Sequence, residues 1–172
     1  MAERKDVVKF KGNPLTLVGN ELKVGDRAPD AEVLANDLSE VKLSGFGGKV
    51  CLICTVPSLD TPVCDIQTRK FNEQAASLGN DVVVLTISMD LPFAQQRWCG
   101  AANVENVQTL SDHRKAEFGT EYGVLIKELR LLARTVFVVD KEGIIRYIEI
   151  VDEVTKEPNY EAALSAAKEV KK

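Results

Sequence analysis

The sequence predicts an α/β fold in which a central mixed sheet is flanked by helices. Two strongly apolar segments, residues 50–56 and 81–88, have the length and β-branched content of strands that are covered on both faces. The segment between them, residues 62–78, has the features of a helix that ends at Gly79-Asn80. A helix that crosses over between two such strands makes a right-handed unit, so we expect the two strands to be parallel.

Shorter elements surround this central unit, and turn residues between periodic segments mark their ends. In chain order they are a hairpin over residues 7–18 around Gly12-Asn13, short strands at 32–34 and 41–43, a helix from Pro92 to about Trp98 ended by Gly100, a short strand at 107–110, a helix over 112–118 before a loop bounded by Gly119 and Gly123, a hairpin of 135–140 and 144–151, and an amphipathic helix over 160–170. This order predicts parallel strands inside the sheet and an antiparallel hairpin at its end, which favours a thioredoxin-like fold.

Length and composition indicate one globular domain, residues 1–172. The chain is 45% hydrophobic and 28% charged, with a net charge of −4. It has no basic patch that would favour nucleic acid, and no apolar run near the roughly 20 residues of a membrane span. The N-terminal segment lacks an apolar signal core, so we expect a cytoplasmic protein that does not insert into membranes.

Cys64 is the strongest candidate for chemistry. It follows the first central strand, and ligands bind at the carboxyl ends of such strands. Thr61 is predicted to cap the next helix with its hydroxyl, and Pro62 fits the first helical position. Cys64 then lies in the first turn, where free backbone N–H groups and the helix dipole favour a thiolate. The alternative is a half-buried cysteine that only packs.

Charges near Cys64 argue in both directions. Asp60 and Asp65 oppose a thiolate, because nearby anions disfavour a second negative charge. A cation should offset them, and Arg134, at the start of a later strand, is our candidate. Its alternative role is that of a surface arginine flanking a strand.

The other cysteines have less specific settings. Cys51 and Cys54 form a Cys-x-x-Cys motif, but residues three apart on a strand point to opposite faces, so we interpret both as core residues. No second such motif completes a zinc site, and His113 is the single histidine, so we expect no metal. Cys99 could be a packed helix residue or a resolving thiol that attacks an oxidised Cys64.

Three separated motifs give the chain a family resemblance over nearly its full length. They are Pro57-Ser-Leu-Asp-Thr61-Pro-Val-Cys64, Asp90-Leu-Pro-Phe-Ala-Gln-Gln-Arg-Trp-Cys99-Gly and Leu132-Ala-Arg134-Thr-Val-Phe-Val. With these motifs the chain resembles the thiol peroxidases, a bacterial subfamily of the peroxiredoxins. Cys51 and Cys54 depart from the family pattern, in which these strand positions usually carry other apolar residues.

The resemblance implies a function and a set of site residues. Cys64 would be the peroxidatic cysteine and Cys99 the resolving cysteine of the same chain, with Thr61 and Arg134 completing the peroxide pocket and Pro57 shielding it. The family reduces hydrogen peroxide and organic hydroperoxides, takes electrons from thioredoxin, works as a homodimer and needs no metal, haem or other cofactor.

The implied reaction makes a sulfenic acid on Cys64, with which Cys99 then condenses to a disulfide. Because two sulfurs on different helices can lie beyond the reach of a disulfide, about 7 Å between Cα atoms, we expect the turn after Thr61 to unwind during turnover. Two other functions stay open on the sequence: a thiol-disulfide oxidoreductase without peroxidase activity, and a catalytically silent binding module.

Overall fold

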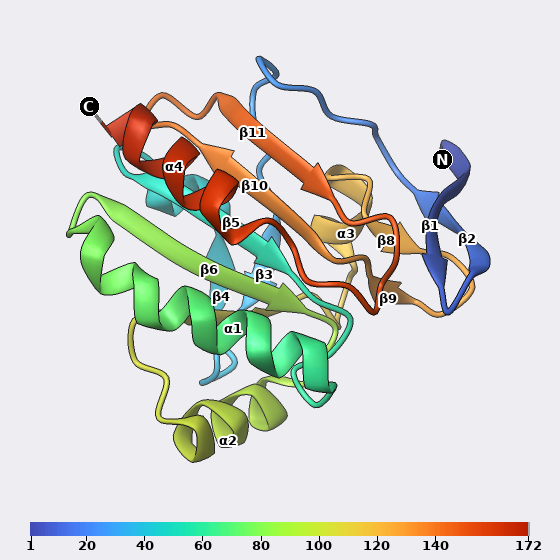
Figure 1. The fold of residues 1–172 in the computed structure, drawn as a ribbon, viewed down its shortest axis with the longest axis horizontal. Coiled ribbons are helices and arrows are strands. Elements are labelled where there is room, and N and C mark those ends of the chain that lie inside the picture. The colour runs from blue at the N-terminus through green and yellow to red at the C-terminus, as the bar shows by residue number, and fades with distance from the viewer. Residues whose placement is uncertain (172) are drawn as a thin grey trace.

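The computed structural model describes residues 1–171 and contains two β-sheets, the larger of which carries the helices (Figure 1). The larger sheet has the strand order β11-β10-β5-β6-β7-β3-β4, and the smaller one has the order β1-β2-β8-β9. The strands are β1 (Glu3–Phe10), β2 (Asn13–Val18), β3 (Glu32–Leu34), β4 (Glu40–Lys42), β5 (Val50–Thr55), β6 (Val82–Ser88), β7 (Gln108–Ser111), β8 (Leu125–Ile126), β9 (Leu131–Leu132), β10 (Thr135–Val139) and β11 (Ile145–Ile150).

The centre of the larger sheet is parallel, as the sequence predicts. Strand β5 pairs in parallel with β6, and β6 pairs in parallel with β7, whereas β10 and β11 form the antiparallel hairpin at one end. Side chains of β5 alternate between two apolar cores: Cys51 and Ile53 pack into one, and Leu52 and Cys54 into the other. Because both faces of β5 are covered, its sequence is a continuous apolar run.

Helices pack against strands of this sheet. Helices α1 (Pro62–Ala75) and α4 (Tyr160–Lys171) lie on the same face, and α2 (Pro92–Ala102) lies beside α1 (Figure 1). Phe71 of α1 and Ala163 and Ala167 of α4 enter the core beneath them. A short 3₁₀ turn (Ala76–Leu78) extends α1 to Gly79, where the helix was predicted to end. Another 3₁₀ turn (Leu43–Phe46) takes up Leu43, which the sequence placed in a strand.

The smaller sheet was not anticipated beyond its first hairpin. Strand β2 pairs with β8, which pairs with β9, and each of these two partners has only two residues. Strands this short show no alternation of apolar and polar residues, so the sequence gives no signal for them. The hairpin also contacts the far end of the chain: the Lys9 amide donates to the Asp152 carbonyl, and the Val154 amide donates to the Lys9 carbonyl.

Two predicted helix bounds were wrong. Helix α2 does not end at Gly100 but continues to Ala102, and Asn103 ends it in the left-handed conformation that asparagine tolerates. The next helix, α3 (Glu117–Glu121), begins five residues later than predicted and includes Gly119. Its start is fixed by Asp112, whose carboxylate accepts hydrogen bonds from the amides of Phe118 and Gly119.

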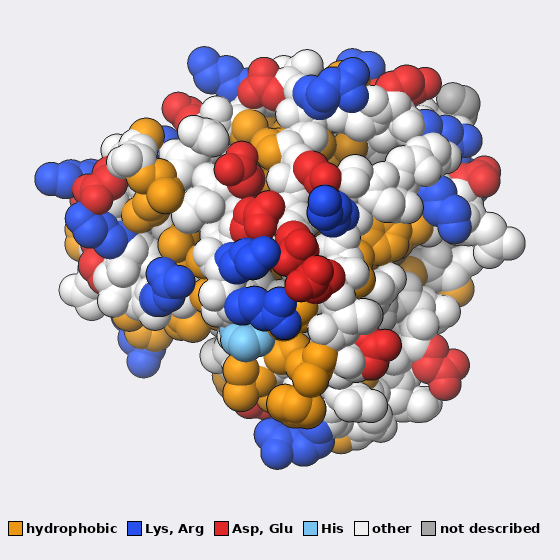
Figure 2. Space-filling view, turned by 180° about the vertical axis from the view of Figure 1, so that it is seen from behind, with side chains coloured by type: hydrophobic (Ala, Val, Ile, Leu, Met, Phe, Trp, Pro, Cys, Tyr) orange, Lys and Arg blue, Asp and Glu red, His pale blue; other side chains and the backbone are white. Residues whose placement is uncertain are grey.

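The surface carries charges of both signs. On the face shown in Figure 2, lysine and arginine side chains are interspersed with aspartate and glutamate, so that face has no basic patch. Within residues 1–171, every helix is too short or too polar to cross a bilayer.

Replacement of Cys54 tests whether this thiol is a core residue. Its side chain is 0% exposed among apolar neighbours. Cys54→Ser puts a hydroxyl there without an arranged partner, so we expect the free energy of unfolding to fall by about 1–3 kcal/mol. Urea unfolding of the reduced protein measures this. Cys99→Ser is the control, because Cys99 is only half-buried and already contacts a hydroxyl. Equal stability of Cys54→Ser and the parent chain would contradict the core assignment.

Candidate active site

Cys64 lies at the start of α1, in the turn that follows β5. Thr61 precedes the helix in an extended conformation, Pro62 is the first helical residue and Cys64 the third. The Cys64 side chain is 0% exposed and packs with Val56 and Leu59. The first backbone N–H groups of a helix have no partner within the helix, and Cys64 lies in this first turn.

Thr61 does not cap α1 with its side chain, so this prediction was wrong. Its hydroxyl donates to the Ser58 carbonyl at 3.0 Å, and its amide donates to the same oxygen at 3.2 Å. The hydroxyl proton is engaged in the turn before the helix, and the side chain makes no capping bond to α1. The N–H groups of the first turn therefore remain available to a ligand or to the sulfur.

Arg134 contacts the Cys64 sulfur. Its Nη2 lies 3.3 Å from Cys64 Sγ, and the side chain is 1% exposed. Strand pairing explains the encounter: β10 runs antiparallel to β5, and Thr135 at its start is opposite Thr55 at the end of β5. The residue before β10 therefore lies beside the loop that leads to Cys64. Of the two alternatives for Arg134, the surface arginine is excluded.

Two further groups hold the Arg134 guanidinium in place. Gln67 Oε1 accepts from Nη1 at 2.7 Å, and the Val154 carbonyl accepts from Nε at 3.0 Å and from Nη2 at 2.8 Å. Neither group was predicted from the sequence. Gln67 follows Cys64 by three positions, which places the two on one helix face, and this spacing could have indicated it. The Val154 carbonyl is a backbone group, for which the sequence carries no signal.

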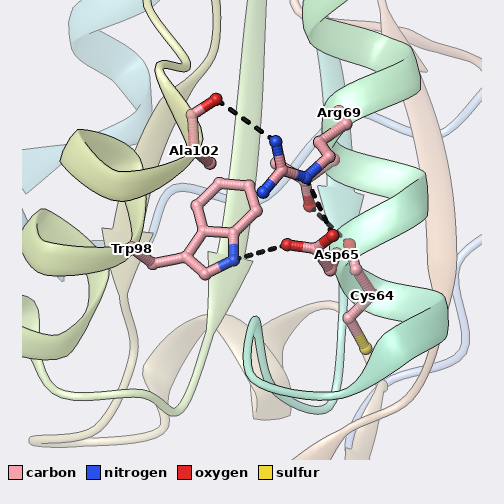
Figure 3. Close-up of polar contacts among 6 residues, drawn as sticks. Cys64, Asp65, Arg69, Trp98 and Ala102 are labelled. Carbon is pink, nitrogen blue, oxygen red and sulfur yellow. Dashed lines mark hydrogen bonds and ion pairs between the residues drawn. The ribbon is translucent and has the colours of Figure 1, made fainter.

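The Asp65 carboxylate, next to Cys64, pairs with groups other than Arg134. Among residues 1–171, no aspartate or glutamate forms an ion pair with Arg134. The Asp65 carboxylate instead accepts from Arg69 Nε and from Trp98 Nε1, each at 2.8 Å. Figure 3 shows the Cys64 sulfur pointing away from this carboxylate. The expected opposition of Asp65 to a thiolate is therefore reduced.

The loop before Cys64 is tied to the loop before α2. The Asp90 carboxylate accepts from the Ser58 hydroxyl at 2.7 Å, from the Leu59 amide at 2.8 Å and from the Ser88 hydroxyl at 2.7 Å. Pro57, in the same loop, is buried. These contacts fix the path of the chain between β5 and α1.

Cys99 lies on α2, the helix beside α1 (Figure 1). It is half-buried, and its sulfur lies 3.3 Å from the Thr109 hydroxyl on β7. It lines an open groove of about 750 Å³ to which Cys64 does not contribute. The two sulfurs therefore have different neighbours: a guanidinium for Cys64 and a hydroxyl for Cys99.

Cys51 and Cys54 take no part in this arrangement. They point into opposite cores, as the sequence predicts for positions three apart on a strand. Burial raises the pKa of the Cys51 thiol to about 11, and burial raises the pKa of Cys54 further still. Both therefore stay neutral thiols at physiological pH, unsuited to attack on a substrate.

Known proteins resemble the chain over nearly all of its length. The Redoxin family matches residues 23–164. A thiol peroxidase of Halalkalibacterium halodurans is 61% identical over 161 residues, which are 94% of this chain and 96% of that protein. A thiol peroxidase of Bacillus subtilis is 60% identical with the same coverage.

Solved structures agree with these relatives. A peroxiredoxin-like protein from Aquifex aeolicus matches with a TM-score of 0.89 and 51% identity, covering 95% of this chain and 96% of that one. A thiol peroxidase from Chromobacterium violaceum has the same fold, with a TM-score of 0.83 at 20% identity over 94% and 95% of the two chains. The chain belongs to the Redoxin family and, within it, to the thiol peroxidases, which are enzymes of the peroxiredoxin type.

Proposed function

We propose that the chain, as one domain, reduces hydroperoxides with Cys64 as the attacking thiolate. A single observation carries this proposal: the Cys64 sulfur, in the first turn of α1, lies 3.3 Å from the buried guanidinium of Arg134. Thiol peroxidases are the relatives of this chain, and Cys64 is the cysteine whose surroundings suit that chemistry best.

Arg134 forms no ion pair with a carboxylate among residues 1–171. Glu157 is near enough to feel its charge, but that carboxylate accepts hydrogen bonds from Tyr160 and Lys70 instead. Guanidinium stays protonated in proteins, and burying an uncompensated cation is costly. Its other partners, Gln67 and Val154, are neutral oxygens. Among the hydrogen-bond partners of Arg134 within residues 1–171, the Cys64 sulfur is the group that can become an anion, so we propose that a Cys64 thiolate compensates the buried charge.

The first step is a displacement at oxygen. The Cys64 sulfur forms a bond to one peroxide oxygen with its electron pair, the O–O bond breaks, and the other oxygen leaves with a proton as water or alcohol. Sulfur is oxidised to sulfenic acid and the peroxide is reduced. Arg134 and the N–H groups of the first turn stabilise the charge that develops on both oxygens. Thr61, whose hydroxyl proton goes to the Ser58 carbonyl, aligns the peroxide by accepting a hydrogen bond from it, and Pro57 keeps water out of the pocket.

The second step joins Cys64 and Cys99. The Cys99 sulfur attacks the sulfenic sulfur, an S–S bond forms, and the S–O bond breaks to release water. Since the two sulfurs have different neighbours, the first turn of α1 unwinds to let them meet. A dithiol protein of the thioredoxin type then reduces the disulfide, which returns both thiols.

Several further properties are proposed from the family rather than from the site. These are a homodimeric assembly, a cytoplasmic location, thioredoxin as the physiological reductant, and both hydrogen peroxide and organic hydroperoxides as substrates. No metal or other cofactor is required, because the sulfur itself carries the two electrons.

Mass spectrometry of the intact, fully reduced protein after one equivalent of hydrogen peroxide tests the proposal. We expect a loss of two hydrogens and a peptide map that joins Cys64 to Cys99. In Cys99→Ser the sulfenic acid should accumulate on Cys64. A disulfide between other cysteines would contradict the site assignment. Reaction with disulfides but not with peroxide would favour an oxidoreductase of another kind.

Replacement of Arg134 tests the electrostatic part of the mechanism. Arg134→Ala should lower the second-order rate constant for oxidation of Cys64 by about 10²-fold, the usual cost of losing one donor to developing charge. Stopped-flow mixing with peroxide measures this constant. Arg146→Ala, which removes an exposed arginine paired with Asp140, is the control and should react at the parent rate. An unchanged constant in Arg134→Ala would remove this residue from the mechanism.

A further inference from the structure

The two helices that carry the reactive cysteines are joined by a hydrogen bond between the residues next to those cysteines. Trp98 Nε1 on α2 donates to Asp65 Oδ1 on α1 at 2.8 Å (Figure 3). Asp65 follows Cys64 in the chain, and Trp98 precedes Cys99. Any movement that separates the first turn of α1 from α2 must break this bond.

Arg69 adds three contacts to the same junction. Its Nε donates to Asp65 Oδ2 at 2.8 Å, so both oxygens of that carboxylate are occupied. Its guanidinium carbon lies 5.7 Å from the centre of the Trp98 ring, and Nη1 donates to the Ala102 carbonyl at the end of α2 at 3.3 Å (Figure 3). We call Asp65, Arg69 and Trp98 the helix latch.

Apolar packing couples the helix latch to the reactive sulfur. The Trp98 ring packs against the small cluster of Val56, Leu59 and Cys64, as well as against the larger core under α1. Trp98 therefore covers the side of the Cys64 turn that faces α2. A shift of α2 that brings Cys99 toward Cys64 must displace this ring.

Both cysteines are free in this structure, and their sulfurs contact different groups. Cys64 Sγ contacts Arg134, and Cys99 Sγ contacts Thr109 on β7. At least one of the two helix segments must leave its place before a bond can form between the sulfurs. Because Asp65 and Trp98 adjoin the two cysteines, unwinding of either segment opens the helix latch.

We propose that the helix latch sets the rate at which Cys99 resolves the sulfenic acid on Cys64. This proposal rests on the proposed function, in which the Cys99 sulfur forms the S–S bond and the sulfenic oxygen leaves as water. A closed latch lengthens the life of the sulfenic acid. During that time a second hydroperoxide can oxidise it to sulfinic acid and is itself reduced to water or alcohol. The latch thus sets the peroxide concentration at which the enzyme inactivates itself.

Trp98→Phe removes the hydrogen bond and keeps an aromatic ring in the cluster. We expect disulfide formation to become about tenfold faster or more, given the strength of hydrogen bonds to charged groups. The fraction of sulfinic acid at a fixed peroxide concentration should fall accordingly. Acid quenching at a series of times, followed by mass spectrometry, measures sulfenic acid, disulfide and sulfinic acid separately from the first oxidation step.

Asp65→Ala is the second variant, because it removes the acceptor and leaves Trp98 intact. It should speed disulfide formation like Trp98→Phe. The double variant should be about as fast as the faster single variant, well below the product of the two effects, since both remove the same contact. Asp65→Asn keeps an acceptor for Trp98 and should lie between Asp65→Ala and the parent chain. Circular dichroism of each reduced variant checks its fold.

Lys70→Gln is a matched control on the same helix. Lys70 has the same kinds of contact as Arg69, an ion pair with Glu157 at 3.1 Å and a position 4.7 Å from the ring centre of Tyr160, but these partners lie outside α2. Disulfide formation in Lys70→Gln should proceed at the parent rate. A change as large as that in Asp65→Ala would overturn the specific role of the latch.

The remaining outcomes separate the latch from the reaction it regulates. If the parent protein forms the disulfide and both Trp98→Phe and Asp65→Ala form it at the parent rate or more slowly, the latch proposal is wrong and the proposed function stands. If the parent protein forms neither sulfenic acid nor disulfide with peroxide, the proposed function fails and the latch proposal fails with it.

Discussion

The contact between the Arg134 guanidinium and the Cys64 sulfur is the constraint on which the rest of the site depends. It places a permanent cation, almost without exposure to water, against a group that can ionise. Burial makes the attraction between the two charges strong and makes an unpaired guanidinium costly. The reactive form of the thiol and the stability of the buried arginine are therefore two aspects of one interaction.

The fold supplies this contact from three distant parts of the chain. Antiparallel pairing of β10 with β5 places Arg134 at the edge of the sheet where the Cys64 loop begins. The Val154 carbonyl accepts two hydrogen bonds from the guanidinium, and the Val154 amide donates to the Lys9 carbonyl of the N-terminal hairpin. The hairpin, which lies far from α1 and α2 in Figure 1, thus supports the active site through the segment after β11.

The sequence predicts those features that depend on local patterns. The apolar run of β5 and the proline at the start of α1 predict where Cys64 lies, and strand alternation predicts that Cys51 and Cys54 are separated. Contacts that tertiary structure creates were not accessible. The sequence made Arg134 a candidate cation, but its contact with Cys64 could not be predicted. The Trp98–Asp65 bond depends on how α2 packs beside α1. The Thr61 cap failed because the preceding Ser58 carbonyl competes for the same hydroxyl.

The ionisation of Cys64 tests the central claim most directly. In a Cys99→Ser background the remaining thiols, Cys51 and Cys54, stay neutral near physiological pH, so the thiolate absorbance in the ultraviolet reports Cys64 alone. We expect strong thiolate absorbance at neutral pH that is largely lost when Arg134 is also replaced by methionine. Thiolate absorbance that develops only in the alkaline range of a simple thiol, or that is the same with and without Arg134, would contradict it.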